Sequence, residues 1–143
     1  MNSCALVIPC YNEAARLKSD VFIDFARAHA EICFVFVNDG SRDDTSSVLK
    51  ALASKIPAQA NVLDNSVNQG KAAVVRQGVL HAIDSLDVET IGYWDADLAT
   101  PLPSAIEMLN LLESNPALNM IFGARVQLLG RQIDRKPHRH YLG

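Results

Sequence analysis

The sequence lacks the features that mark several common classes of protein. Its three cysteines, Cys4, Cys10 and Cys33, show no Cys-x-x-Cys spacing. This argues against a disulfide framework or a zinc site and fits a reducing, cytoplasmic environment. No run approaches the roughly 18 consecutive apolar residues that a membrane-spanning helix needs. The segment before Pro9 has no basic region, so it does not resemble a signal peptide either.

Several familiar site motifs are also missing. The chain has no GxxxxGK[ST] phosphate loop, no GxGxxG after its first apolar run, no HExxH and no nucleophile elbow. His29 and His81 fall within helical patterns without a Cys or carboxylate at ligand spacing, which favours packed or surface histidines over catalytic ones. Aromatic residues make up only 6% of the chain and its first 124 residues are acidic, so we expect no nucleic-acid partner.

What the chain does have is an uneven distribution of charge. Residues 1–124 carry eight Lys and Arg against fifteen Asp and Glu, whereas residues 125–143 carry five basic residues against one acid. The basic end includes Arg125, Arg135 and Arg139. It predicts either an anionic partner, such as a phosphate group, or simply a solvated helix face.

Apolar runs and helical periods alternate along the chain, without internal repeats. Short β-rich apolar runs predict strands, and apolar residues that recur every three or four positions predict helices. At 143 residues the chain has the length of a single domain, 1–143. The expected strands are 5–8, 32–37, 61–63, 91–94 and 120–122. The expected helices have apolar stripes at Leu17, Val21, Phe25 and Ala28; at Val48, Leu49, Leu52 and Ile56; at Val75, Val79, Ala82 and Ile83; and at Ile106, Leu109 and Leu112.

This alternation predicts an α/β fold in which a mostly parallel central sheet has helices on both faces. Ligands of such sheets bind outside the carboxyl ends of the strands. We therefore expect the polar residues that follow each apolar run to line a site. These segments are rich in Asp, Asn, Gly, Lys and Arg, and they are 9–13, 38–41, 65–71, 95–97 and 123–125.

Asp95-Ala96-Asp97 is the most informative of these segments. Two carboxylates one residue apart repel each other unless a cation lies close to both. Mg²⁺ typically takes one or two carboxylates and completes its shell with phosphate oxygens and water. The triplet therefore predicts a divalent metal beside a phosphorylated ligand. The alternative is a turn in which the Asp side chains bond to the backbone or cap a helix.

Polar residues after the earlier apolar runs indicate a nucleotide. Tyr11 and Glu13 could hold a base and a ribose, and Asp39 could accept a hydrogen bond from a ribose hydroxyl or a base N–H. The alternatives are packing of Tyr11 on a neighbouring loop and a capping role for Asp39. For Ser41 we favour the helix N-cap. Lys71 opens a predicted helix, where free backbone N–H groups and a cation favour an anion.

Five motifs in order resemble those of family-2 glycosyltransferases with the GT-A fold. Residues 7–13, Val-Ile-Pro-Cys-Tyr-Asn-Glu, are similar to the family's V-I-P-x-Y-N-E, and residues 37–45 resemble V-D-D-G-S-x-D-x-T. Residues 68–78 resemble N-x-G-K-(G/A)-x-A-x-x-x-G, Asp95-Ala96-Asp97 resembles the D-x-D, and residues 123–125 resemble G-S-R. The resemblance covers nearly the whole chain. It is closest to the enzymes that make polyprenyl-phosphate sugars, the dolichyl-phosphate glucosyl- and mannosyltransferases.

The resemblance implies a single GT-A, Rossmann-like catalytic domain and a metal-dependent, inverting transfer of a hexose from UDP-glucose or GDP-mannose. Asp95 and Asp97 would be the catalytic pair and would bind Mg²⁺ or Mn²⁺, with Asp97 the stronger metal candidate. The basic residues would neutralise the donor diphosphate. By correspondence with the family motifs, the nucleotide-sugar contacts would be Pro9, Tyr11, Glu13, Asp39, Lys71, Asp95, Ala96, Arg125 and Arg139, with Arg135 as an alternative to Arg139.

Three departures from the family pattern bear on these expectations. Asn38 stands where the family has the first acid of an Asp-Asp pair, so one nucleoside contact would differ. Ala99 replaces the Gln that related mannosyltransferases often have, which favours UDP-glucose over GDP-mannose. The chain also stops inside an expected helix, where family members continue with acceptor-side structure and often membrane helices. We therefore expect a truncated catalytic domain whose full-length form associates with the cytoplasmic face of a membrane.

The expected acceptor is a polyprenyl or dolichyl phosphate. Asp134 is the only acid after Gly123, and an anionic phosphate oxygen, unlike a sugar hydroxyl, needs no strong general base. Two alternatives remain: a family-2 enzyme that acts on a polysaccharide or glycoprotein hydroxyl, and a nucleotide-sugar-binding module without turnover. The sequence does not fix the oligomeric state, and a homodimer is one option.

Overall fold

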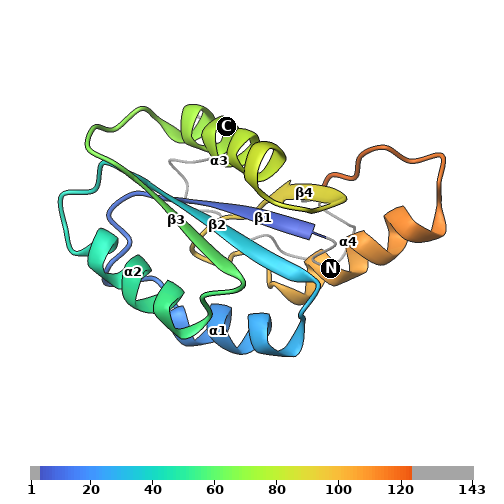
Figure 1. The fold of residues 1–143 in the computed structure, drawn as a ribbon, viewed down its shortest axis with the longest axis horizontal. Helices are drawn as coiled ribbons and strands as arrows, with labels where there is room; N and C mark the ends of the chain where they lie inside the picture. The colour runs from blue at the N-terminus through green and yellow to red at the C-terminus, as the bar shows by residue number, and fades with distance from the viewer. Residues whose placement is uncertain (1–3, 124–143) are drawn as a thin grey trace, which may run out of the picture. The chain divides into compact units, whose positions relative to one another are not determined.

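A computed structural model describes residues 4–123 of the chain (Figure 1). The chain divides into two compact units, residues 1–104 and 105–143. Helix α4 (Pro103–Ser114) begins at the end of the first unit and continues in the second. The other described elements all belong to the first unit. They are β1 (Cys4–Cys10), α1 (Ser19–Ala28), β2 (Ile32–Asp39), α2 (Thr45–Lys55), β3 (Ala60–Asn65), α3 (Lys71–Ser85) and β4 (Thr90–Tyr93).

The four strands form one sheet in the order β3-β2-β1-β4, and every pairing is parallel. Because every pairing is parallel, all four strands end at the same edge of the sheet. The register places Cys10 opposite Asn38, and Asn38 opposite Asp64. The predicted parallel α/β fold is thus confirmed for strands 5–8, 32–37, 61–63 and 91–94.

The two faces of the sheet are covered by different helices, with α1 and α2 on one side and α3 on the other (Figure 1). Because side chains alternate along a strand, β2 serves both faces. Its Phe34 and Phe36 each pack edge-on against Phe22 of α1, with ring centroids 5.3 Å apart in both pairs. Its Val35 and Val37 pack in a cluster with Val74 of α3. Burial on both faces explains why the sequence of β2 is an almost unbroken apolar run.

The apolar stripes of α1 and α3 differ in part from those that the sequence predicts. Helix α1 begins after Leu17 and buries Phe22, Phe25 and Ala26, while Val21 is 44% exposed. The predicted stripe with Val21 and the observed stripe with Phe22 overlap in this segment. The stripe that contains two aromatic rings, Phe22 and Phe25, is buried because rings remove more apolar area from water. In α3 the buried residues are Val74, Gly78 and Ala82, and Ile83 is 61% exposed. Helix α2 buries Leu49 and Leu52, and Ile56, directly after it, is buried too, as predicted, whereas the predicted Val48 is half-buried.

Residues 120–122 form no strand, so that prediction is wrong. A short apolar run becomes a strand only where it pairs with a free edge, and the pairings of residues 4–123 involve β1 to β4 alone. Met120 and Phe122 are 65% and 79% exposed. Within the same residues, no helix has the length and apolar character to cross a bilayer.

Candidate functional site

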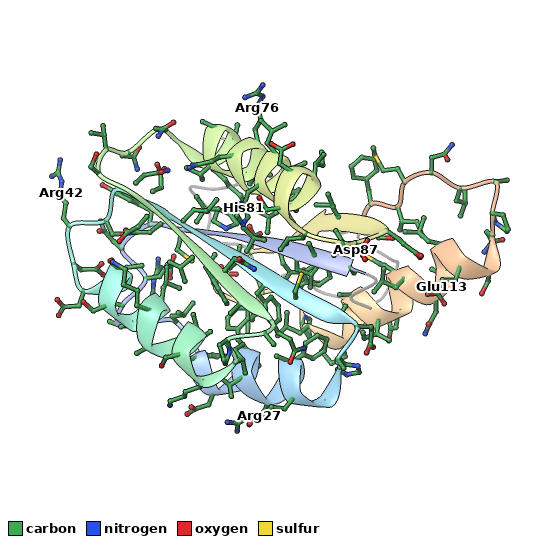
Figure 2. All side chains as sticks on the ribbon, in the orientation of Figure 1. Arg27, Arg42, Arg76, His81, Asp87 and Glu113 are labelled. Carbon is green, nitrogen blue, oxygen red and sulfur yellow. The ribbon has the colours of Figure 1, made fainter. Side chains whose placement is uncertain are left out.

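The loops that follow β1, β2 and β3 surround a pocket of about 320 Å³. The predicted ligand residue Tyr11 is among its walls and is 41% exposed. Arg42, on the loop after β2, lies where these loops gather, whereas Asp87 lies at the other end of the sheet (Figure 2). The parallel order of the strands therefore brings three of the predicted segments, 9–13, 38–41 and 65–71, together as expected. The residues lining the pocket are Tyr11, Gly40, Ser41, Arg42, Ser66, Val67 and Asn68.

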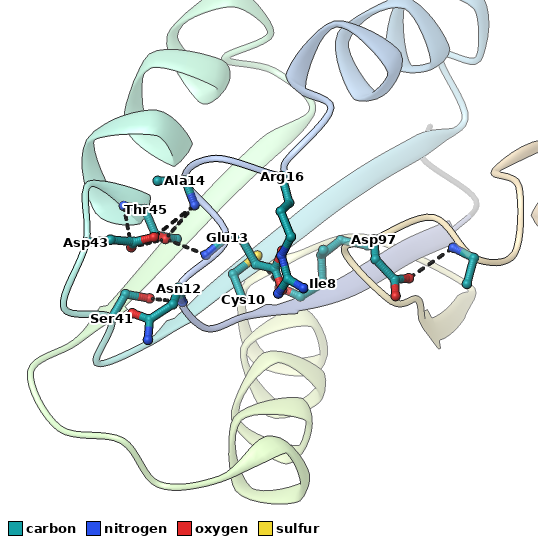
Figure 3. Close-up of polar contacts among 11 residues, drawn as sticks. Ile8, Cys10, Asn12, Glu13, Ala14, Arg16, Ser41, Asp43, Thr45 and Asp97 are labelled. Carbon is teal, nitrogen blue, oxygen red and sulfur yellow. Dashed lines mark hydrogen bonds and ion pairs between the residues drawn. The ribbon is translucent and has the colours of Figure 1, made fainter. Parts of the chain in front are cut away.

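The loop after β1 is held against the loop after β2 by hydrogen bonds from backbone N–H groups to side-chain oxygens (Figure 3). The Asn12 N–H donates to Ser41 Oγ at 2.9 Å, and the Arg42 N–H donates to Asn12 Oδ1 at 2.9 Å. The Glu13 N–H donates to Oγ1 of the buried Thr45 at 2.8 Å. Asn12 adopts a φ of +52°, which Asn tolerates better than most residues. These bonds fix the backbone that carries Tyr11 and Glu13.

Glu13 has one carboxylate oxygen without a partner. Its side chain is 13% exposed, and its Oε1 accepts a hydrogen bond from Arg16 Nη2 at 2.8 Å. Its Oε2 is buried and has no hydrogen-bond partner in the described part of the chain. A buried acceptor left unpaired is costly, so this oxygen marks a place where a ligand donor would be stabilised. Glu13 itself is not among the residues that line the pocket.

Cys10, at the end of β1, does not act as a nucleophile in this setting. Burial, and secondarily the charge of Glu13, raise the pKa of its thiol to about 12. Its Sγ donates to the Ile8 carbonyl oxygen at 3.5 Å. A thiol with so high a pKa stays protonated at neutral pH. Cys10 is thus a buried structural residue.

The end of β2 presents its two polar residues to opposite faces of the sheet. Asn38 and Asp39 are each 3% exposed. Asn38 belongs to the face of α2, where its Nδ2 donates to Asp64 Oδ1 at 2.7 Å. Asp39 belongs to the face of α3, where its two oxygens accept from the Gln69 and Gly70 N–H groups at 2.6 and 3.0 Å. Asp39 therefore holds the loop that leads into α3, a role that the sequence did not predict.

Gly40 allows the loop after β2 to approach the loop after β3. It has a φ of +62°, and a Cβ at this position would lie 2.5 Å from the Asn68 nitrogen and 2.5 Å from the Val67 carbonyl carbon. Backbone atoms at that distance cannot yield to a side chain, so only glycine fits. Gly40 and Asp39 together fix the wall of the pocket formed by Val67 and Asn68.

Ser41 is not the N-cap of α2, which corrects the prediction made from the sequence. The helix begins at Thr45, after Asp44. Ser41 instead donates its hydroxyl to Asn38 Oδ1 at 2.5 Å and accepts from the Asn12 N–H. The first turn is supported by Asp43, whose Oδ1 accepts from the Thr45 N–H at 3.0 Å. Tertiary contacts therefore outweigh the capping preference of Ser41.

Asp95 and Lys71 form an ion pair at the end of β4. Lys71 Nζ donates to Asp95 Oδ1, and the same ammonium lies 5.6 Å from the centroid of the Tyr93 ring. The side chains of Lys71 and Asp95 are 59% and 47% exposed, so the pair contributes little to stability. The predicted phosphate ligand and one predicted metal ligand are thus brought into direct contact.

Asp97 and Ala96 complete the turn after β4. Ala96 is buried, and Trp94 fixes the start of the turn by donating its backbone N–H to the Val7 carbonyl oxygen at 2.9 Å. Asp97 Oδ1 accepts from the Ala99 N–H at 2.9 Å, and Leu98 has a φ of +54°. The Asx-type turn considered from the sequence is therefore present. It leaves Asp97 exposed at the same edge of the sheet as Asp95.

The residues of this turn fit a divalent cation that a phosphorylated ligand helps to coordinate. Within residues 4–123, no group of three or more His, Cys, Asp or Glu side chains could enclose a metal ion. Mg²⁺ and Mn²⁺, however, prefer oxygen ligands, and Mg²⁺ takes one or two carboxylates and fills its shell with phosphate and water. Asp95 and Asp97 supply carboxylates of that kind.

The remaining predicted site residues divide into two groups. Pro9 is half-buried within β1, where it pairs with Val37. Arg125, Arg135 and Arg139 lie outside the described residues. Among the residues that the sequence did not single out is Asp64. The third strand runs to Asn65 rather than stopping at 63, so Asp64 lies within the strand, and the predicted polar segment 65–71 begins one residue too late to include it.

Comparison with solved structures identifies the fold. The structure is similar to a mannosyltransferase from Pyrobaculum calidifontis solved with GDP-Man and Mn²⁺, with a TM-score of 0.62, 20% identity, and coverage of 79% of this chain and 32% of that one. It is also similar to S. aureus TarS residues 1–349, with a TM-score of 0.59 and 17% identity over 78% of this chain and 32% of that one. The fold is therefore that of the GT-A glycosyltransferases, as predicted.

The sequence then identifies the family. Residues 5–141 match the model of glycosyl transferase family 2. The chain is 32% identical to the dolichyl-phosphate beta-glucosyltransferase ALG5C of Trichomonas vaginalis, and the match covers 96% of this chain and 43% of that relative. It is 24% identical to a poly-beta-1,6-N-acetyl-D-glucosamine synthase of Staphylococcus epidermidis, over 83% of this chain and 27% of that protein. The chain belongs to glycosyl transferase family 2 and spans less than half the length of these relatives.

Proposed function

We propose that this chain is the donor-binding, catalytic part of an inverting glycosyltransferase that moves a hexose from a nucleotide-diphosphate sugar to a polyprenyl or dolichyl phosphate. The observation that carries the proposal is the 32% identity, over 96% of this chain, to a dolichyl-phosphate beta-glucosyltransferase. The pocket at the strand ends, with Lys71, Asp95 and Asp97 at the same edge, supports it independently. UDP-glucose is the preferred donor and GDP-mannose the alternative.

The nucleoside would occupy the pocket beside Tyr11. The exposed face of Tyr11 suits a planar base, and the unpaired, buried Oε2 of Glu13 suits a hydrogen-bond donor of the nucleoside. Both carboxylate oxygens of Asp39 accept hydrogen bonds from backbone N–H groups, so we assign Asp39 chiefly to holding the loop 68–70. The lone pairs that remain on its oxygens could still accept from the ligand.

The diphosphate would lie toward Lys71. This residue is the first of α3, where the N-terminal N–H groups and the ammonium both favour an anion. Asp95 and Asp97 would hold Mg²⁺ or Mn²⁺, which supplies positive charge to the departing diphosphate. Lys71 would then leave Asp95 and contact a phosphate oxygen. Arg125 and Arg139, or Arg135, would add positive charge around the same group.

The transfer itself would be a single displacement at the anomeric carbon. An oxygen of the acceptor phosphate forms the new bond to C1, and the bond from C1 to the diphosphate breaks, so that the nucleoside diphosphate leaves with both electrons. The acceptor oxygen is already anionic near neutral pH, so no side chain must remove a proton. A lipid phosphate acceptor would place the full-length protein at the cytoplasmic face of a membrane.

The test is a transfer assay with radiolabelled UDP-glucose or GDP-mannose, Mn²⁺ and either dolichyl phosphate or an oligosaccharide acceptor. The proposal predicts label in the organic phase with dolichyl phosphate, abolished by Asp97→Asn and retained by the control Asp87→Asn at the opposite edge of the sheet. Label on the oligosaccharide alone would favour the polysaccharide or glycoprotein enzyme. Donor binding without transfer or donor hydrolysis would favour a binding module.

A further inference from the structure

We propose that Asn38 is a positioning residue of the donor site: paired with Asp64, its amide fixes Ser41 and, through Ser41, the loop that carries Tyr11 and Glu13. This inference rests on the proposed function, since positioning of that loop affects binding only if the pocket takes a nucleotide. Asn12, Asn38, Ser41 and Asp64 are called the amide cluster below.

The amide cluster crosses three adjacent strand ends. Asn38 is opposite Asp64 of β3 on one side and Cys10 of β1 on the other. It is 3% exposed, so its amide must find partners within the protein. It has two: Nδ2 donates to Asp64 Oδ1 at 2.7 Å, and Oδ1 accepts from Ser41 Oγ at 2.5 Å and from the Ser41 N–H at 3.3 Å.

Asp64 determines which way the amide of Asn38 points. Asp64 Oδ2 accepts from Ser46 Oγ at 2.5 Å and from Lys50 Nζ at 2.7 Å. These bonds, with the one from Asn38, lower the pKa of Asp64 to about 2, so it is an anion at neutral pH. An anionic oxygen can only accept, and the Asn38 amide must turn its NH₂ toward it. The amide oxygen then faces Ser41.

Ser41 transmits this orientation to the loop after β1. Its hydroxyl proton is donated to Asn38, which leaves its oxygen lone pairs for the Asn12 N–H at 2.9 Å. The side-chain Oδ1 of Asn12 in turn accepts a hydrogen bond from the Arg42 N–H. The loop after β2 thus holds the left-handed turn at Asn12, the residue between Tyr11 and Glu13 in the chain. Ser41 also lines the pocket.

A carboxylate at position 38 would break this arrangement. One of its oxygens could still accept from Ser41, but the other would face the Asp64 anion at the distance of a hydrogen bond with no proton between them. Like charges this close disfavour each other strongly. The new side chain would turn away from Asp64 and release Ser41. Exchanging the two residues restores one donor and one anion, because an amide at position 64 can donate to a carboxylate at position 38, and that carboxylate can accept from Ser41.

The experiment compares wild type, Asn38→Asp, Asp64→Asn and the exchanged double variant N38D/D64N. Each is titrated with UDP and with GDP in the presence of Mn²⁺, and hydrogen exchange of the Asn12 N–H is followed by NMR. Asn61→Asp is the charge-matched control, since it adds the same charge on β3 away from its end. Circular dichroism reports whether each variant is folded.

The proposal predicts that N38D weakens nucleotide binding about tenfold, corresponding to the loss of about one buried hydrogen bond. It predicts faster exchange of the Asn12 N–H in N38D, with recovery of both properties in N38D/D64N. Folded N38D in which either property is unchanged, or a double variant without recovery, would overturn it. Should N38D not fold, Ser41→Ala decides, because unchanged Asn12 exchange in that variant would also overturn the proposal.

The two readouts separate this inference from the proposed function. Wild-type chain that binds neither UDP nor GDP would contradict the proposed function, whereas the exchange rate of the Asn12 N–H still tests whether Asn38 positions the loop. Nucleotide binding that is unaffected by N38D would retain the proposed function and overturn the positioning role.

Discussion

The carboxyl ends of β1 to β3 and the carboxyl end of β4 lie at the same edge of the sheet but are organised differently. At β1 to β3, polar side chains bond mainly to protein groups, as in the amide cluster and in the bonds from the loop 68–70 to Asp39, and the central Asn38 and Asp39 are buried. At β4, Asp95 and Asp97 are exposed, and Asp95 is paired with the exposed Lys71. The first end is rigidly organised by protein contacts, whereas the second leaves charged groups available to exchange partners.

The difference agrees with the chemistry assigned to each end. A base and ribose are recognised by shape and by a few fixed donors and acceptors, which must already be in place to avoid an ordering cost on binding. A diphosphate with a divalent cation carries several charges, and the protein groups that contact it must exchange ion pairs as it arrives.

Substitution of Gly40 should have the largest effect, because it acts on the rigid end. Gly40→Ala combines a φ of +62° with a Cβ 2.5 Å from backbone atoms of Val67 and Asn68, and we expect a loss of about 3 kcal/mol in the free energy of unfolding. Gly70→Ala is the matched control. It has a φ of +89° but open space around the new Cβ, and should cost about 1–2 kcal/mol. Equal losses in urea unfolding would contradict the close approach of the two loops.

Removal of Asp97 should have the next largest effect, on the open end. Asp97→Ala is expected to weaken Mn²⁺-dependent binding of UDP-glucose by about 10–100-fold, as for loss of a hydrogen bond or ligand contact to a charged group. It should change stability little, because the side chain is exposed and bonds only to the Ala99 N–H among the described residues. Asp87→Ala is the control. Unchanged affinity, measured by calorimetry, would remove Asp97 from the metal site.

Lys71→Met should produce a smaller loss. It removes the ammonium next to Asp95 and at the start of α3, and we expect donor affinity to fall about fivefold, since exposed charge pairs contribute modestly. Lys55→Met, at the end of α2, should leave affinity unchanged. A variant that binds the donor more tightly would mean that the pair with Asp95 competes with the ligand more than Lys71 assists it.

The pH dependence of the amide cluster should be the smallest effect. The bonds from Lys50, Ser46 and Asn38 depress the pKa of Asp64 to about 2 from an ordinary 3.8. Its stabilising contribution is therefore complete above about pH 4 and is lost as the pH falls toward 2. Asp64 is partly exposed, so the contribution should stay below about 1 kcal/mol. Urea unfolding of wild type and Asp64→Asn should differ less at pH 3 than at pH 6, and an equal difference would contradict the assignment.

The sequence predicts the open end of the site better than the rigid one. Asp95, Asp97 and Lys71 can be identified from local sequence alone, because each is a charged residue directly after an apolar run or at the start of a helical pattern. The parallel sheet follows likewise from alternation of apolar runs. The bonds of Asn38 to Asp64 and of Ser41 to Asn12 join residues 26 and 29 positions apart, and only the register of the sheet brings them together. For the same reason Ser41 is taken for a helix cap from its local sequence.

Two further errors have the same physical origin. The apolar stripe of α1 is selected by the Phe34 and Phe36 rings of β2, which the helix sequence does not contain. Residues 120–122 have the composition of a strand but no pairing with β1 to β4. In both cases the packing or pairing partner, rather than the local sequence, decides whether an apolar residue is buried or forms part of a strand.

The most direct test of the account is chemical-shift mapping of UDP-glucose and GDP-mannose binding to the isotope-labelled chain, with and without Mg²⁺. The account predicts Mg²⁺-dependent shifts concentrated in residues 11–14, 40–42, 66–71 and 95–97, at the carboxyl ends of the strands. Shifts concentrated at the opposite edge of the sheet, around Asp87 (Figure 2), would contradict it. Absence of shifts with either donor, in a chain whose spectrum is that of a folded protein, would contradict it equally.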